Sequence, residues 1–201
     1  MTEDRPFSPA AERNREPIRA VLLAWLPDSG SMLEIGAGTG QHARDFAAAL
    51  PDWRWQPTEH PDELPRLSAG LAGVDLPNLA EPLALDVDGQ WPDGRWDAVY
   101  SANTAHIMAW PSVTAMFAGV AASLAPGGRF FLYGPFMRGG RHHAPSNEEF
   151  DAGLRARPGG MGVRDLGDLD RLAEPLGLVR VAELAMPSNN HTLIFEQPER
   201  D

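Results

Sequence analysis

The stretch that most constrains this chain is 32–43, MLEIGAGTGQHA, in which a short apolar run leads directly into three glycines at alternate positions. The glycines are Gly36, Gly38 and Gly40, and Glu34 stands two residues before the first of them. Glycine adopts positive φ values at little cost and lets another group approach the backbone closely. A single tight turn does not require three such residues. The stretch therefore predicts a buried strand, a loop that a ligand approaches, and then a helix.

Two nucleotide-binding motifs have glycines at comparable spacing, and neither fits. The dinucleotide fingerprint G-x-G-x-x-G, begun at Gly36, requires a small residue at position 41, where this chain has Gln41. A P-loop requires a lysine after its last glycine, and the segment after Gly40 offers none. The remaining pattern, Glu-x-Gly-x-Gly-x-Gly at the end of a strand, resembles the first motif of class I S-adenosylmethionine-dependent methyltransferases. A strand-to-helix turn without a ligand is the alternative.

The rest of the sequence alternates helix-like and strand-like segments. Apolar residues recur with helical spacing after Pro17, at 43–50 and at 116–124. Strand-like runs after the first one lie at 53–59, 81–87, 96–103, 128–136, 178–187 and 191–197. Strands that alternate with helices favour a parallel sheet with helices on both faces. Only SNN at 188–190 separates the last two runs, which is too short for a crossover helix, so these runs should form an antiparallel hairpin.

The composition narrows the class of protein. The 201 residues, 43% of them hydrophobic, suit one domain spanning 1–201, which opens with a polar leader and helix at 1–29. The net charge of −11 disfavours nucleic acid as a partner, because nucleic-acid binders usually carry a basic patch. The sequence has no cysteine, no apolar run that reaches the roughly 20 residues of a membrane helix, and no signal-like start. We therefore expect a cytoplasmic protein without a membrane partner.

Two acidic residues follow later strands at positions where an adenosine-containing ligand needs acceptors. One carboxylate accepts from both hydroxyls of a ribose, and such an acid is expected about 20 residues past the glycine turn. Glu59, at the end of 53–59, is at that place. Asp86 and Val87 end the third strand, where methyltransferases of this class place an acid for the adenine amino group and a backbone amide for the ring. For either acid alone, a solvated loop carboxylate is the equal alternative.

Nine segments, in order along nearly the whole chain, resemble the signatures of one little-characterised methyltransferase-like family known as a domain of unknown function. They are RNREPI (13–18), LEIGAGTGQHA (33–43), WQPTE (55–59), PLALDV (82–87), ANTAHI (102–107), YGPF (133–136), SNEEFDAGLR (146–155), GVRD (162–165) and MPSNN (186–190). The chain departs from the family in two places: Glu59 stands where aspartate is expected, and the prolines of 60–73 make the usual second helix doubtful.

This resemblance implies a Rossmann-like methyltransferase sandwich with a mostly parallel seven-stranded sheet, a C-terminal antiparallel hairpin and helices on both faces. It implies S-adenosyl-L-methionine as the cofactor. The implied cofactor-binding residues are Glu34, Gly36, Gly38, Gly40, Gln41, Glu59, Asp86, Val87 and Asn103. The resemblance does not identify the methyl acceptor.

The acceptor side has to be inferred from the residues themselves. Ligands of open α/β sheets lie at the carboxyl ends of the strands, which makes His106 and Tyr133 the candidate catalytic residues. His106 is the natural base by its pKa, and a structural hydrogen bond is the equal alternative. Adjacent histidines at 142–143 do not share a helix face and lack an acidic third ligand at an obvious spacing, so no metal site is predicted. The candidate substrate-binding residues are Arg15, Phe136, Asn147, Arg164, Asn189 and Asn190.

A long connection at 137–165 follows the fifth strand. Connections of this length at the edge of a site are usually lids. Ser146 and Glu149 have the spacing of a capping box, and Phe150 and Leu154 share one face of the helix that would follow. We therefore expect 137–165 to be a lid-like insertion whose short helix covers the pocket.

Three classes of function compete at this point. The favoured one is S-adenosylmethionine-dependent methyl transfer to a polar small molecule, with a protein side chain as a less favoured acceptor. The second is a protein that binds S-adenosylmethionine without turnover, for example a scaffold, and no feature of the sequence separates it from the first. The third, a nicotinamide-dependent oxidoreductase, is disfavoured by Gln41. The sequence gives no indication of the oligomeric state.

Overall fold

The computed structural model describes residues 5–199, so residues 1–4 of the predicted leader and residues 200–201 lie outside it. The helices are α1 (Pro9–Trp25), α2 (Gln41–Ala49), α3 (Leu64–Leu71), α4 (Trp110–Ser123), α5 (Pro145–Arg155), α6 (Leu166–Ala173) and the short 3-10 helix η1 (Glu174–Leu176). The strands are β1 (Gly30–Ile35), β2 (Trp53–Glu59), β3 (Leu83–Ala84), β4 (Trp96–Ala102), β5 (Leu124–Gly134), β6 (Phe136–Arg138), β7 (Arg141–His142), β8 (Arg164–Asp165), β9 (Val179–Met186) and β10 (Asn190–Glu196).

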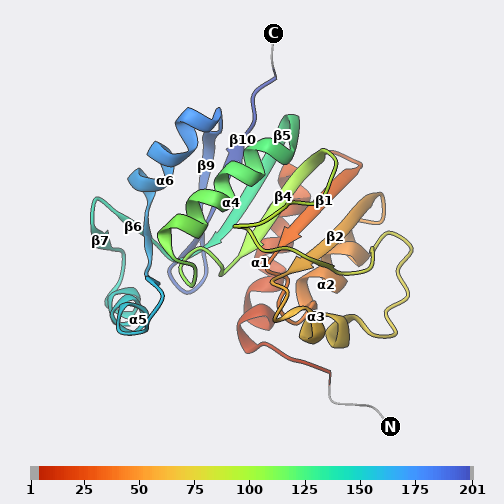
Figure 1. Ribbon diagram of the computed structural model, residues 1–201, viewed down its shortest axis with the longest axis horizontal. Coiled ribbons are helices and arrows are strands. Elements are labelled where there is room, and N and C mark those ends of the chain that lie inside the picture. Colours follow the sequence, from red (N-terminus) through yellow and green to blue (C-terminus); the bar gives the residue numbers. More distant parts are fainter. Residues whose placement is uncertain (1–4, 200–201) are drawn as a thin grey trace.

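Seven of the strands form one sheet in the order β3-β2-β1-β4-β5-β10-β9 (Figure 1). The pairs that join β3, β2, β1, β4 and β5 are all parallel. β10 runs antiparallel to both β5 and β9. The predicted α/β fold, with a mostly parallel seven-stranded sheet that ends in an antiparallel hairpin, is confirmed. The order reverses next to β1, and such a switch point is where open α/β sheets bind ligands.

Helices cover both faces of this sheet, as predicted. In Figure 1, α4 and α6 lie in front of the sheet and α1 lies behind it. The front core packs Phe117 of α4 and Leu169 of α6 against Phe130 and Phe195 of the sheet. The core behind the sheet is a second cluster, in which α1 and α2 pack on the other face of the same strands. No helix among residues 5–199 is both long enough and apolar enough to span a membrane.

Helix α1 begins eight residues earlier than the position of Pro17 suggested. Ser8 caps it by accepting a hydrogen bond from the backbone N–H of Ala11, and Pro9 occupies the first turn. Pro17 lies inside the helix, where it removes one backbone hydrogen bond without ending the helix. The prediction of a polar leader was therefore wrong for residues 9–16. The buried face of α1 includes Asn14 one turn before Ile18, and a polar residue there gives no apolar periodicity.

The helix that the prolines of 60–73 made doubtful is present as α3. Pro65 is compatible with it because it lies in the first turn, where its missing N–H would have had no intrahelical partner. The predicted third strand is much shorter than 81–87 and keeps only the two residues of β3, which pair with the end of β2.

The segment 137–165 folds into a small substructure beside the end of the main sheet. Its strands form a second sheet in the order β7-β6-β8, and α5 follows β7 (Figure 1). The predicted helix in this segment is confirmed, but the predicted capping box is not. Ala144 occupies the N-cap without a side-chain hydrogen bond, and Ser146 lies within the first turn because Pro145 starts the helix.

Candidate active site

Two adjacent hollows open at the carboxyl ends of the parallel strands. The first, of about 470 Å³, is lined by the ends of β1 and β2, by the segment after β3 and by the loop after β4. The second, of about 320 Å³, is lined by the glycine loop, the start of α1, the loop after β4 and α5. Gly36 lines both hollows, so they meet at the glycine loop.

The three glycines of the loop all have positive φ, between 61° and 70°, but they differ in what surrounds them. A Cβ at Gly36 would lie 2.5 Å from a methyl group of Thr104, and a Cβ at Gly40 would lie 2.6 Å from Leu71 of α3. A Cβ at Gly38 would meet nothing within 4 Å. Packing therefore requires glycine at the first and third positions, and only Gly38 leaves open space that a ligand can fill.

Two carboxylates predicted from separate strands line the first hollow together. Glu59 accepts hydrogen bonds from the backbone N–H of Gly38 at 2.6 Å and from that of His60 at 2.8 Å. Asp86 lines the same hollow, beside Val87. The apolar side chains of Ile107 and Met108, which the sequence analysis did not single out, complete its wall. The hollow thus combines two acceptors with an apolar surface, as a nucleoside requires.

Glu34 lies beneath the glycine loop rather than on its surface. Its carboxyl group is buried and accepts a hydrogen bond from the indole N–H of Trp55 at 2.7 Å. Burial raises the pKa of Glu34 to about 8, the nearby charge of Glu59 adds to the rise, and the bond from Trp55 opposes it. Glu34 lines neither hollow.

The shifted pKa of Glu34 predicts how stability depends on pH. A pKa of about 8 in the folded state, against 4.5 ordinarily, means that Glu34 contributes stability below pH 4.5 that is lost as pH rises toward 8. Buried His42 and His106, whose pKa values fall from 6.5 to about 4, act in the opposite direction below pH 6.5. We therefore expect the free energy of unfolding to fall by about 2 kcal/mol between pH 6.5 and pH 8.

The test is urea unfolding across this pH range for the wild type and for Glu34→Gln. The amide oxygen of glutamine still accepts from Trp55, but the side chain does not ionise. The stability of the variant should not fall above pH 6.5. The stability of the control Glu81→Gln, at an exposed position, should fall as that of the wild type does. An unchanged slope in Glu34→Gln would contradict the assigned pKa.

His106 lies in the second hollow beside α5. Its ring packs edge-on against Phe150 of α5, with the ring centroids 5.2 Å apart. Burial, and to a lesser degree the charge of Arg164, lowers the pKa of His106 to about 4, so the imidazole is neutral at physiological pH. Asn103 lines the same hollow in a left-handed conformation, with φ at 60°. The hollow therefore offers a neutral imidazole and an amide beside the open space at Gly38.

A chain of buried polar side chains connects α1 to the sheet behind this hollow. The Nε2 atom of His42 lies 2.8 Å from Oδ1 of Asn14, and its Nδ1 atom lies 3.1 Å from the hydroxyl of Tyr100. Burial raises the pKa of Tyr133, while hydrogen bonds to Asn14 and Asn190 oppose the rise. No role was predicted for Asn14, His42 or Tyr100, although the segments RNREPI and LEIGAGTGQHA contain Asn14 and His42. The structure thus brings Tyr133 and Asn190 together but buries Tyr133 outside the two hollows.

Several predicted site residues bind other parts of the chain instead of lining a hollow. The guanidinium of Arg15 pairs with Asp45 at 2.9 Å. Gln41 accepts from the backbone N–H of Ser8, which fastens the start of α1 to the glycine loop. Arg164 donates to the backbone carbonyls of Ala105, Met108 and Gly160, and so joins the segment 137–165 to the loop after β4.

The remaining predicted substrate residues lie in the core or where α5 meets the turn between β9 and β10. Phe136 is buried in the front core. The Asn147 side chain donates to the backbone carbonyl of Asn189 at 3.0 Å, and this bond holds α5 against the turn between β9 and β10. Asn190 donates to the carbonyl of Pro187 in the same turn.

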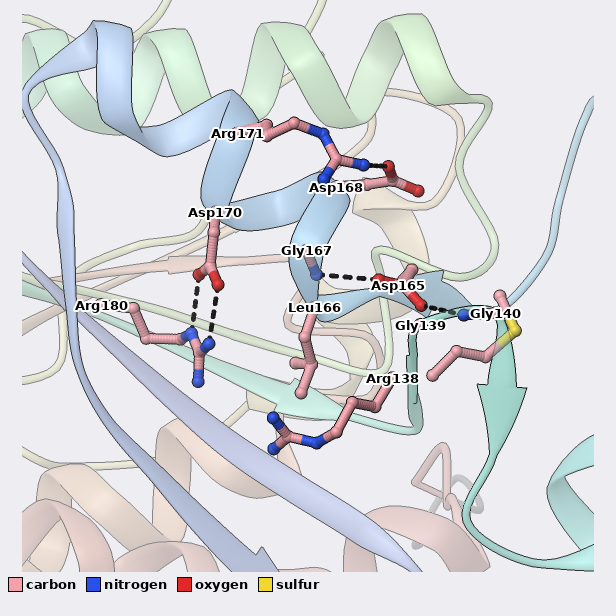
Figure 2. Close-up of a pocket in the computed structure, with 11 residues that line it drawn as sticks. Arg138, Gly139, Gly140, Asp165, Leu166, Gly167, Asp168, Asp170, Arg171 and Arg180 are labelled. Atoms are coloured by element: carbon pink, nitrogen blue, oxygen red, sulfur yellow. Dashed lines mark hydrogen bonds and ion pairs between the residues drawn. The ribbon is translucent and has the colours of Figure 1, made fainter.

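A third hollow, of about 490 Å³, lies between the turn after β6 and α6, and does not share a lining residue with the other two. Figure 2 shows its charged side chains facing one another in pairs: Arg180 with Asp170, and Arg171 with Asp168. Arg138 pairs with Glu183. Because its arginines are already paired, this hollow does not resemble an anion-binding site.

Comparison with known protein families shows to which family the chain belongs. Residues 5–197 match the model of a family described as a protein of unknown function (DUF938). The chain belongs to the DUF938 family. The predicted resemblance to a family catalogued as a domain of unknown function is confirmed by this match, and the predicted methyltransferase-like fold is confirmed by solved structures of that fold.

Three solved structures have a fold similar to that of this DUF938 protein. An O-methyltransferase family protein from Burkholderia thailandensis has a TM-score of 0.80 at 14% identity. The match covers 96% of this chain and 58% of that protein. Mitomycin 7-O-methyltransferase MmcR has a TM-score of 0.78 at 19% identity, and the match covers 93% of this chain and 55% of MmcR. Human N-acetylserotonin methyltransferase in complex with SAM has a TM-score of 0.78 at 14% identity, and the match covers 94% of this chain and 53% of the human protein. The chain thus shares their fold and spans little more than half the length of each.

Proposed function

We propose that this DUF938 protein binds S-adenosyl-L-methionine and transfers its methyl group to a polar small molecule. The observation that carries the proposal is the pair of carboxylates, Glu59 and Asp86, in one hollow that meets the open space at Gly38. The methyltransferases with the same fold support it, and one of them is human N-acetylserotonin methyltransferase in complex with SAM.

The residues fit the cofactor part by part. Glu59 would accept from the ribose hydroxyls, Asp86 from the adenine amino group, and Ile107 with Met108 would face the ring. The open position at Gly38 and the amide of Asn103 would receive the amino-acid part. Glu59 also holds the loop, because its carboxylate accepts from the N–H of Gly38.

When bound, S-adenosyl-L-methionine supplies an electrophilic methyl group on a positively charged sulfur. The protein then has to orient the acceptor in line with this group and exclude water. Phe150 of the lid helix covers the second hollow from the side of His106, which favours a small acceptor over a protein side chain. Neutral His106 accepts a hydrogen bond, or a proton, from a hydroxyl or amine of the acceptor. These groups suit a polar acceptor.

Thermal unfolding with candidate ligands tests the cofactor class. S-adenosylhomocysteine at 100 times its dissociation constant should stabilise the protein by about 2.7 kcal/mol and raise its melting temperature, because it binds the folded state alone. NAD should leave the melting temperature unchanged, since Gln41 occupies the position of the third small residue of the dinucleotide fingerprint. Stabilisation by NAD and not by S-adenosylhomocysteine would refute the proposal.

Transfer itself requires a separate assay. Protein incubated with methyl-labelled S-adenosylmethionine and fractions of a metabolite extract should label a small polar product. A protein that binds the cofactor in the thermal assay and labels no fraction would support the scaffold alternative.

A further inference from the structure

A cluster of potential metal ligands lies outside the two hollows of the candidate active site. The side chains of His143, Glu183 and His191 each offer one ligand atom, and these three atoms lie within 4.8 Å of one another. His143 follows β7 in the lid, Glu183 lies on β9, and His191 lies on β10. Two imidazoles and one carboxylate are a ligand set that Zn²⁺ uses in proteins.

We propose that His143, Glu183 and His191 bind a divalent transition metal ion of the Zn²⁺ type, which fastens the lid to the C-terminal hairpin. The ion would connect segments that are far apart in the sequence, since β7 belongs to the lid and β9 and β10 end the main sheet. This site is independent of the proposed methyl transfer.

Two arginines hold the carboxylate of Glu183 through one of its oxygens. Arg138 and Arg180 both donate to its Oε2 atom. Its Oε1 atom lies 3.8 Å from Nε2 of His191. Outer-shell bonds of this kind commonly orient a carboxylate ligand and leave its other oxygen for the metal. The ion pair between Arg180 and Asp170, drawn in Figure 2, offsets one of the two positive charges beside Glu183.

The two histidines also have the properties of ligands. Their ring centroids are 4.7 Å apart, with the planes inclined by 43° rather than stacked. The Nδ1 atom of His191 is buried and has no hydrogen-bond partner within residues 5–199.

Only a small adjustment separates the observed arrangement from a metal site. Ligand atoms at about 2.1 Å from a tetrahedral Zn²⁺ lie about 3.4 Å apart, against the present limit of 4.8 Å. His143 is exposed, so its ring is free to turn toward the other two residues, and solvent reaches the fourth position. The lid would thereby be held on two sides, since Asn147 already binds the turn between β9 and β10.

The proposal is tested with untagged protein and Zn²⁺ or Co²⁺ alone. The wild type should bind one Zn²⁺ per chain in competition with a chromophoric chelator, and bound Co²⁺ should show the visible absorption of a tetrahedral site. His143→Ala should weaken the affinity for Zn²⁺ at least about 100-fold. This variant changes an exposed side chain, and its circular dichroism should match that of the wild type.

The adjacent histidine provides the matched control. His142 pairs with Asp151 and does not belong to the cluster, so His142→Ala should bind Zn²⁺ as the wild type does. His191→Ala should behave like His143→Ala. Absence of saturable Zn²⁺ binding by the wild type, or affinity that survives in both His143→Ala and His191→Ala, would overturn the proposal.

Discussion

Gly38→Val is expected to abolish binding of S-adenosylhomocysteine while the protein remains folded. The open space at this residue is where we place the amino-acid part of the cofactor, and a branched side chain would occupy it. The affinity, measured by isothermal titration calorimetry, should fall at least about 100-fold, which corresponds to about 2.8 kcal/mol of binding free energy. Gly38 has a φ of 61°, so valine there also strains the backbone.

Gly73→Val separates these two effects. Gly73 has a φ of 68° and nothing within 4 Å of the added Cβ, but it lies on the surface after α3 and lines neither hollow. The two variants should therefore lose comparable stability, of the order of 1–2 kcal/mol, from the left-handed backbone conformation. Only Gly38→Val should lose the ligand, and equal affinities in the two variants would rule out the glycine loop as the cofactor site.

Glu59→Ala is the second change for which we expect a large effect. The carboxylate holds the backbone N–H groups of Gly38 and His60, and it faces the hollow where we place the ribose. Its removal should weaken binding of S-adenosylhomocysteine about 100-fold, because both the loop and the ligand lose a charged acceptor. Calorimetric titration at constant pH measures the effect.

Glu59→Asp tests the departure from the family pattern directly. Aspartate is the residue expected at this position, and it keeps the charge with a shorter side chain, so its affinity should stay within about tenfold of the wild type. Glu81→Ala, at an exposed position outside the hollow, should bind normally. Wild-type affinity in Glu59→Ala would disprove the role assigned to this carboxylate.

Signals that are local in the sequence predicted most of the fold. The glycine loop, the alternation of strands and helices, and the short SNN turn fixed the sheet and its antiparallel end. Glu59 and Asp86 were also predictable, because the carboxyl ends of parallel strands lie along one edge of a sheet. Spacing and turn chemistry act within a few residues, and they can be read before any tertiary contact is known.

Contacts between distant segments decided which side chains face a hollow and which bind other parts of the chain. Gly36 and Gly40 have to be glycines because Thr104 and Leu71 pack against them, and Gly38 is the one of the three loop glycines that faces open space. Arg164, predicted to bind substrate, instead binds three backbone carbonyls. No spacing in the sequence distinguishes an arginine that faces a pocket from one that completes a loop, because the difference depends on which carbonyls the fold leaves without partners.

Thus the sequence by itself determined the order of the main elements, the mostly parallel sheet with its antiparallel end, and the sheet edge at which we propose that a ligand binds. Only the tertiary structure placed Asn14 behind the second hollow, buried Glu34 beneath the loop, and gathered His143, Glu183 and His191 from the lid and two strands. The physical reason is the range of the interactions. Backbone preferences and apolar periodicity act over one or two turns of chain, whereas side-chain partners and pKa shifts depend on the packing of elements distant in sequence.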